Sequence, residues 1–204
     1  MLNLIKKDIL LQKNLGLVYL GLIALYLYID ISLVLTITMT CSLFVLHSHY
    51  YDEKDHSNML LNSLPYTRKE IVTSKYLEAI LAIIPVSIVG IVSKLIYTGG
   101  DFEFSYTSIL MGLFCTMIFT AFYLPFFYKF TQQYLMMIGA ALMGLAIALM
   151  PAITRFVTKH FSDQINTLLN MSEIQLYTIF GSISILLFVF SWKLTVSIYS
   201  KRVF

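Results

Sequence analysis

Apolar stretches about as long as a bilayer is thick recur along this chain, and short polar segments separate them. A helix needs about 20 apolar residues to cross a hydrocarbon core of about 30 Å. Little more than Asp30 separates the first two stretches, which predicts a tight hairpin. Because backbone exposed to lipid must satisfy its own hydrogen bonds, we predict an all-α integral membrane protein with a single domain over residues 1–204. Six stretches predict six transmembrane helices: Leu11–Ile29, Ile31–Tyr50, Tyr76–Tyr97, Tyr106–Tyr128, Tyr134–Ile153 and Ile174–Trp192.

Three other segments have the pattern of helices that lie along a membrane surface. Residues 1–14 place apolar and basic positions on different helical faces, which predicts an N-terminal interfacial helix or a continuation of the first span. Residues 154–172 carry an apolar stripe at helical spacing, which predicts a short external helix that gates a pathway or shields the bundle. Residues 52–75 are a long charged insert, which predicts a helical cytoplasmic loop or a solvated connector.

The distribution of charge orients these segments. Only 12% of the residues are charged, against about a quarter in soluble domains, and the net charge of +3 is too small to indicate a nucleic-acid partner. One predicted side holds only Arg155 and Lys159. The other side collects the remaining basic residues that bear on orientation: Lys6, Lys7, Lys13, Lys54, Arg68, Lys69, Lys75, Lys129, Lys193, Lys201 and Arg202. By the positive-inside rule, both termini and the 52–75 loop are cytoplasmic.

The 52–75 loop contains start signals for two helices. Asp55 or Ser57 is suited to cap a helix of two or three turns, which Pro65 would then interrupt. Thr67, with Glu70 three residues later, predicts a capping box at the start of a helix that continues into the third span. A short amphipathic helix held below the membrane between two spans has the shape of a coupling element.

The same loop resembles the signature of type-2 ABC exporter permeases. The resemblance rests on Asp52-Glu53-Lys54, Ser63-Leu64-Pro65, Thr67-Arg68-Lys69-Glu70-Ile71-Val72 and Lys75-Tyr76-Leu77. The opening residues, Leu4-Ile5-Lys6-Lys7-Asp8, are also similar to the start of such permeases. Span number, topology and loop position agree with the family over the whole chain. Its compact members include exporters of amphipathic peptides, among them the phenol-soluble-modulin exporter of staphylococci.

The resemblance implies a permease that works as a homodimer, or as a heterodimer with a second permease, in a bacterial plasma membrane. The chain lacks the G-x-x-x-x-G-K-[ST] motif, so we predict no catalytic residues and no cofactor in it. ATP and Mg²⁺ would then be bound by a cytoplasmic ATPase subunit. The residues implied to bind that partner, as a coupling helix and its rim, are Asp55, His56, Asn58, Leu60, Leu61, Leu64, Pro65, Arg68 and Lys69.

Polar residues within the spans have two interpretations. Ser32, Thr36 and Thr40 recur at every fourth position of the second span, and His47 continues near the same face. They are candidates to line a substrate pathway, and the alternative is hydroxyl groups bonded to the preceding turn or to a neighbouring helix. Glu78 is either a proton or substrate site or the partner of a cation such as Lys75.

Other residues within the spans concern packing and shape. Small residues spaced four apart in the fifth span predict close helix packing: Gly139, Ala140, Gly144 and Ala148. Pro85 and Pro125 predict kinks in the third and fourth spans. His47 and His49 diverge on a helix and have no third ligand at a convincing spacing, so we predict no metal site.

Two other functions compete with transport. An intramembrane enzyme would need converging acids, a Ser/His pair or metal ligands, and the chain has neither a G-x-S-x-G nor an H-E-x-x-H motif. A non-transporting scaffold or sensor would use the same loop to recruit a cytoplasmic protein. The substrate and the choice between homodimer and heterodimer do not follow from the sequence.

Overall fold

The computed structural model describes residues 4, 6–7, 10, 12, 15–54, 66–99, 106–130, 149–150, 154–156, 158–159 and 171–201, and for 51–54 the backbone alone. The secondary structure of this part is helical. Six main helices follow one another in the chain: α2 (Gly16–Tyr28), α3 (Leu33–Lys54), α5 (Arg68–Leu81), α6 (Ile83–Tyr97), α7 (Tyr106–Lys129) and α10 (Glu173–Lys201).

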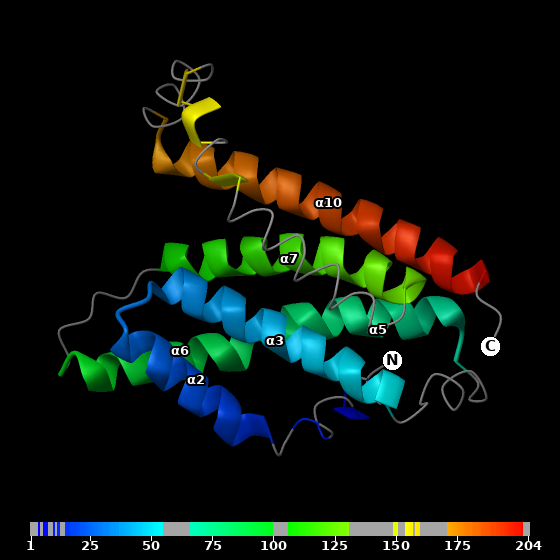
Figure 1. The fold of residues 1–204 in the computed structure, drawn as a ribbon, viewed down its shortest axis with the longest axis horizontal. Helices are drawn as coiled ribbons and strands as arrows, with labels where there is room; N and C mark the ends of the chain where they lie inside the picture. The colour runs from blue at the N-terminus through cyan, green and yellow to red at the C-terminus, as the bar shows by residue number, and fades with distance from the viewer. Residues whose placement is uncertain are drawn as a thin grey trace.

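The helices form a bundle in which α7 lies between α10 and α3 (Figure 1). On the other side of α3, α6 packs against both α3 and α2, so α2 lies at the edge. α5 packs against α10, α7 and α3 at the end of the bundle where α3 ends and α10 finishes (Figure 1). This arrangement places the start of α5, which belongs to the 52–75 loop, among three other helices.

Four helical segments are long and apolar enough to cross a membrane within the described residues: Leu33–Tyr50, Arg68–Tyr97, Tyr106–Lys129 and Glu173–Lys201. They correspond to the second, third, fourth and sixth predicted spans. The first predicted span corresponds to α2, whose 13 residues extend about 20 Å and do not reach across a bilayer by themselves. The fifth predicted span lies almost entirely outside the described residues, as does most of the 154–172 segment.

The turn between α2 and α3 confirms the predicted hairpin. Asp30 has φ 60°, in the left-handed region that Asp tolerates better than most residues. The Asp30 N–H donates to the Leu27 carbonyl at 3.0 Å, and the Ile31 N–H donates to the Tyr26 carbonyl at 2.9 Å. This pair of bonds is a Schellman motif, which satisfies carbonyls left open at the end of α2.

The helix that leaves the 52–75 loop begins and breaks as the sequence predicts. The Thr67 hydroxyl accepts from the Glu70 N–H, and the Glu70 carboxylate accepts from the Thr67 N–H at 2.8 Å, which confirms the capping box. The helix is interrupted at Ala82, between α5 and α6. Pro85 explains the break, since proline has no N–H to donate to the Leu81 carbonyl.

A buried cluster holds the two chain ends and the start of α5 together. Leu4 is buried in it, and so is Tyr199 near the end of α10. The other buried members come from α5 and α7: Ile71, Val72, Tyr76, Leu124, Phe127 and Tyr128. The first and last described parts of the chain therefore lie at the same end of the bundle. Of the predicted 1–14 helix, the described residues Leu4, Lys6, Lys7, Leu10 and Gln12 are helical, and the others lie outside the described part.

Close contact between α7 and α3 depends on Gly112. A Cβ atom at this position would lie 2.9 Å from Cγ2 and 3.2 Å from Cβ of Ile37, which is fully buried. Gly112→Ala is therefore expected to lower the free energy of unfolding by about 1–3 kcal/mol through overpacking. A Cβ atom at Gly21 would meet no atom within 4 Å. Gly21→Ala should therefore raise the free energy of unfolding by up to about 1 kcal/mol, because alanine has the higher helix propensity. Unfolding in mixed micelles measures both, and a rise for both variants would contradict the contact.

Candidate functional site

The start of α5 is fastened to the last turns of α10 by two basic side chains. Arg68 Nη1 donates to the carbonyls of Ser200 at 2.7 Å and Tyr199 at 3.3 Å. A cation at the carboxyl end of a helix also interacts favourably with the helix dipole. Lys69 Nζ lies 5.4 Å from the centre of the Trp192 ring, whose Nε1 donates to the Thr73 hydroxyl at 3.0 Å. These two residues of the predicted partner-binding set thus join α5 to α10, and their contact with a partner stays a prediction.

About two turns further along α5, a group of hydrogen-bonded side chains links α5, α7 and α10. We call Tyr76, Ser191 and Thr195, together with the Ala121 carbonyl, the polar joint. The Tyr76 hydroxyl lies 2.7 Å from the Ser191 hydroxyl and 2.8 Å from the Thr195 hydroxyl, and Ser191 donates to the Ala121 carbonyl. All three side chains are buried.

The Ala121 carbonyl can accept a hydrogen bond in the polar joint because a proline follows it in α7. Pro125 lies four residues after Ala121 within α7 and has no N–H for the Ala121 carbonyl. Ser191, from α10, supplies the missing donor. The predicted kink position of the fourth span is therefore also the point at which α10 is hydrogen-bonded to α7.

A second buried polar group links α5 to α3. Lys75 Nζ lies 3.6 Å from Glu78 Oε2, and each side chain is only 3% exposed. Lys75 Nζ also donates to the Ser48 hydroxyl at 2.9 Å, and that hydroxyl donates to Glu78 Oε2 at 3.0 Å. This confirms Lys75 as a partner of Glu78. We call these three residues the ion-pair cluster.

Three of the predicted pathway residues have local hydrogen bonds in the second span. Ser32 is exposed at the start of α3, where its hydroxyl accepts from the Leu35 N–H at 3.4 Å. Thr36 and Thr40 are fully buried, and their hydroxyls donate to the carbonyls four residues before them, at 3.1 and 2.8 Å. These bonds agree with the alternative interpretation of Ser32, Thr36 and Thr40, in which the hydroxyl groups bond to the preceding turn. Lining of a pathway by these residues stays a prediction.

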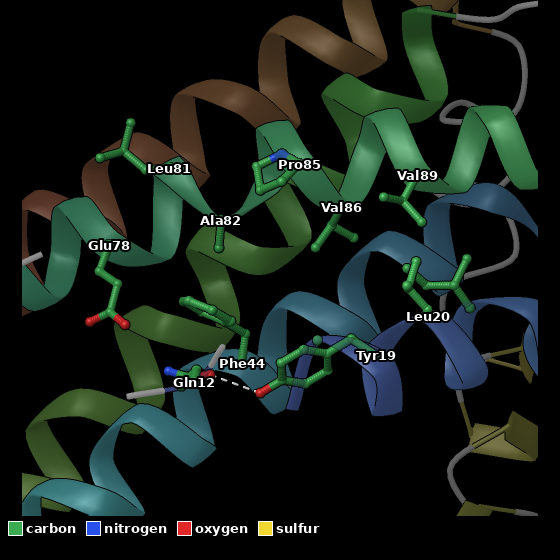
Figure 2. A pocket seen from close by; sticks show the side chains of 12 residues that line it. Gln12, Tyr19, Leu20, Phe44, Glu78, Leu81, Ala82, Pro85, Val86 and Val89 are labelled. Atoms are coloured by element: carbon green, nitrogen blue, oxygen red, sulfur yellow. Dashed lines mark hydrogen bonds between the residues drawn. The ribbon is translucent and has the colours of Figure 1, made fainter. Parts of the chain in front are cut away.

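The fourth predicted pathway residue, His47, belongs to a different contact. Its Nδ1 lies 3.0 Å from the Tyr19 hydroxyl, which donates to Gln12 Oε1 at 2.8 Å. Since the Tyr19 proton goes to Gln12, His47 Nδ1 is the donor in the first bond. Figure 2 shows this end of a groove between α2 and α6, with Gln12 and Glu78 facing one another across it.

The remaining predicted site residues lie outside the described residues. In the loop these are Asp55, His56, Asn58, Leu60, Leu61, Leu64 and Pro65, and in the fifth span Gly139, Ala140, Gly144 and Ala148. Their roles in partner binding and in helix packing stay predictions.

Several residues that join the helices were not singled out from the sequence. Ser191 and Thr195 are four apart and therefore share a face of the last span, which is a signal for a polar contact. Gln12 stands at the start of the first predicted span, where a buried amide needs partners. Tyr19 carries no such signal, because tyrosine is common at membrane interfaces, and Tyr76 was named only as part of the family signature.

The comparison with known families agrees with the membrane architecture. Residues 3–200 match the model of a family described as ABC-2 family transporter protein. No curated protein and no solved structure shows significant similarity to the chain. The chain therefore belongs to the ABC-2 family of transporter proteins, the multi-pass membrane permeases of ABC transporters, and this membership implies a partner ABC ATPase in general.

Proposed function

We propose that this chain is the permease subunit of an ATP-driven exporter of hydrophobic or amphipathic substrates, peptides above all. The family match over residues 3–200 is the observation that carries the proposal. The exporter resembles the type represented by the phenol-soluble-modulin exporter. It acts in a bacterial plasma membrane as a homodimer or with a second permease.

The contacts at the start of α5 support the proposal that the partner ATPase acts on the 52–75 loop. The capping box fixes the first turn of α5 within the 52–75 loop. Arg68, the polar joint and the ion-pair cluster then tie α5 to α10, α7 and α3. A displacement of the loop helix by an ATPase would reach three helices through these contacts, with ATP and Mg²⁺ held by the ATPase.

Leu61→Asp together with Leu64→Asp is the test of docking. We expect these changes to abolish both the complex with the partner ABC ATPase and ATP-dependent uptake of a labelled amphipathic helical peptide into inside-out vesicles. Apolar anchors carry most of the energy of an interface, so two buried charges are sufficient to break it. Pull-down with the purified ATPase and vesicle uptake measure the two effects.

Ile96→Asp is the matched control, since Ile96 is 78% exposed at the end of the third predicted span that lies away from the loop. It should leave the ATPase complex intact. An unchanged complex in the loop variant would refute docking at Leu61 and Leu64. Binding of the ATPase without nucleotide-dependent uptake would favour the scaffold or sensor function instead.

A further inference from the structure

A groove lies between α2 and α6 and continues to the end of α5, with Phe44 of α3 in its wall. Its volume is about 370 Å³, within the range of about 300–1,000 Å³ typical of ligand sites. Apolar side chains form most of its wall, including Leu20, Phe44, Val86 and Val89 (Figure 2). Leu20 is 48% exposed and Leu81 is 42% exposed, so the groove faces the surroundings of the bundle.

The length of the groove corresponds to one leaflet of a bilayer. Its lining on α5 and α6 extends from Glu78 to Val89, and 89 − 78 = 11 residues correspond to about 16 Å of helix. Half of a hydrocarbon core of about 30 Å is about 15 Å. The polar end of the groove, at Gln12 and Glu78, lies at the starts of the first and third predicted spans. It therefore lies at the depth of the headgroups on the predicted cytoplasmic side.

The polar end contains a hydrogen-bond donor that needs an acceptor. Gln12 is only 3% exposed, and its Nε2 has no hydrogen-bond partner in the part of the chain that the structure describes. Its Oε1 accepts from Tyr19, so the nitrogen lies on the side away from Tyr19, at the polar end of the groove (Figure 2). A buried donor without a partner costs about 1–3 kcal/mol. An occupant that places an acceptor at Gln12 recovers this energy.

We propose that the groove binds one acyl chain of a glycerophospholipid from the cytoplasmic leaflet, with the ester carbonyl accepting from Gln12 Nε2. The apolar wall matches the chain, and the buried donor matches the ester at its end. Glu78 of the ion-pair cluster lies at the polar end of the groove, and no ATPase takes part in this binding. The inference depends on the chain spanning a membrane and is independent of the export function.

Two glycines of α2 offer a matched test. A Cβ atom added at Gly16 or at Gly21 meets no atom within 4 Å, but Gly16 lines the groove and Gly21 does not. The protein is reconstituted in nanodiscs of phosphatidylglycerol and phosphatidylethanolamine with a trace of phosphatidylglycerol that carries a diazirine in one acyl chain. Mass spectrometry of peptides then compares labelling at the groove with labelling at Leu186 and Phe190, which are 70% and 68% exposed on α10.

We expect the groove to be labelled more strongly than the α10 face. Gly16→Phe should reduce groove labelling to the level of α10, and Gly21→Phe should leave it unchanged. Gln12→Leu, which keeps the volume but loses the donor, should reduce groove labelling about fivefold, the worth of one hydrogen bond. Equal labelling of the groove and α10 in the unsubstituted protein, or equal effects of the two glycine variants, would overturn the proposal. Disulfide-linked dimers of a Val89→Cys variant would show that a second copy of the chain covers the groove.

Discussion

Replacing Lys75 with methionine is expected to destabilise the protein by about 3–5 kcal/mol. The change leaves the Glu78 carboxylate buried without the cation that lies 3.6 Å away, and it removes a donor to Ser48. Each of the two charged side chains is only 3% exposed, so water does not replace the lost partner. The free energy of unfolding in mixed micelles at neutral pH measures the effect.

A double variant separates the ion pair from the packing of the lysine stem. Lys75→Met with Glu78→Gln removes both charges, and we expect it to recover most of the stability lost in Lys75→Met alone. Lys193→Met, on the exposed side of α10, should change stability by less than about 0.5 kcal/mol. A Lys75→Met variant as stable as Lys193→Met would show that the Glu78 carboxylate does not need the Lys75 cation for the protein to be stable.

The sequence predicts well those helix ends that are set by residues close together in the chain. Thr67 and Glu70 form a capping box from residues three apart, and Asp30 turns the chain within one residue. Both features need only neighbouring residues, so their pattern is visible in the sequence. Pro85 likewise breaks the third span through its own missing N–H.

The candidate site was less accessible from the sequence, because its contacts join helices that are distant along the chain. Tyr76 and Ser191 are 115 residues apart, and Tyr19 and His47 are 28 apart. Hydrophobic periodicity gives the buried face of a helix but not the helix that packs against it. For the same reason, the threonine stripe of the second span could be read as a pathway or as local bonding with equal support.

Ser191→Ala is expected to lower the free energy of unfolding by about 2–3 kcal/mol. The change leaves the Ala121 carbonyl without its donor and removes one of the two hydroxyls that contact Tyr76. Ser182→Ala removes an exposed hydroxyl bonded within α10 and should change stability by less than about 0.5 kcal/mol. Unfolding in mixed micelles compares the two serines directly.

The proline in α7 provides a sharper test of why Ser191 matters. Pro125→Ala restores a backbone N–H that can donate to the Ala121 carbonyl, so this carbonyl no longer depends on α10. In that background, we expect Ser191→Ala to be less destabilising by about 1 kcal/mol, the energy of one hydrogen bond. Equal losses with and without Pro125 would mean that Ser191 acts through Tyr76 alone. A smaller loss in the Pro125→Ala background would establish that Pro125 leaves the Ala121 carbonyl free to accept from Ser191 of α10.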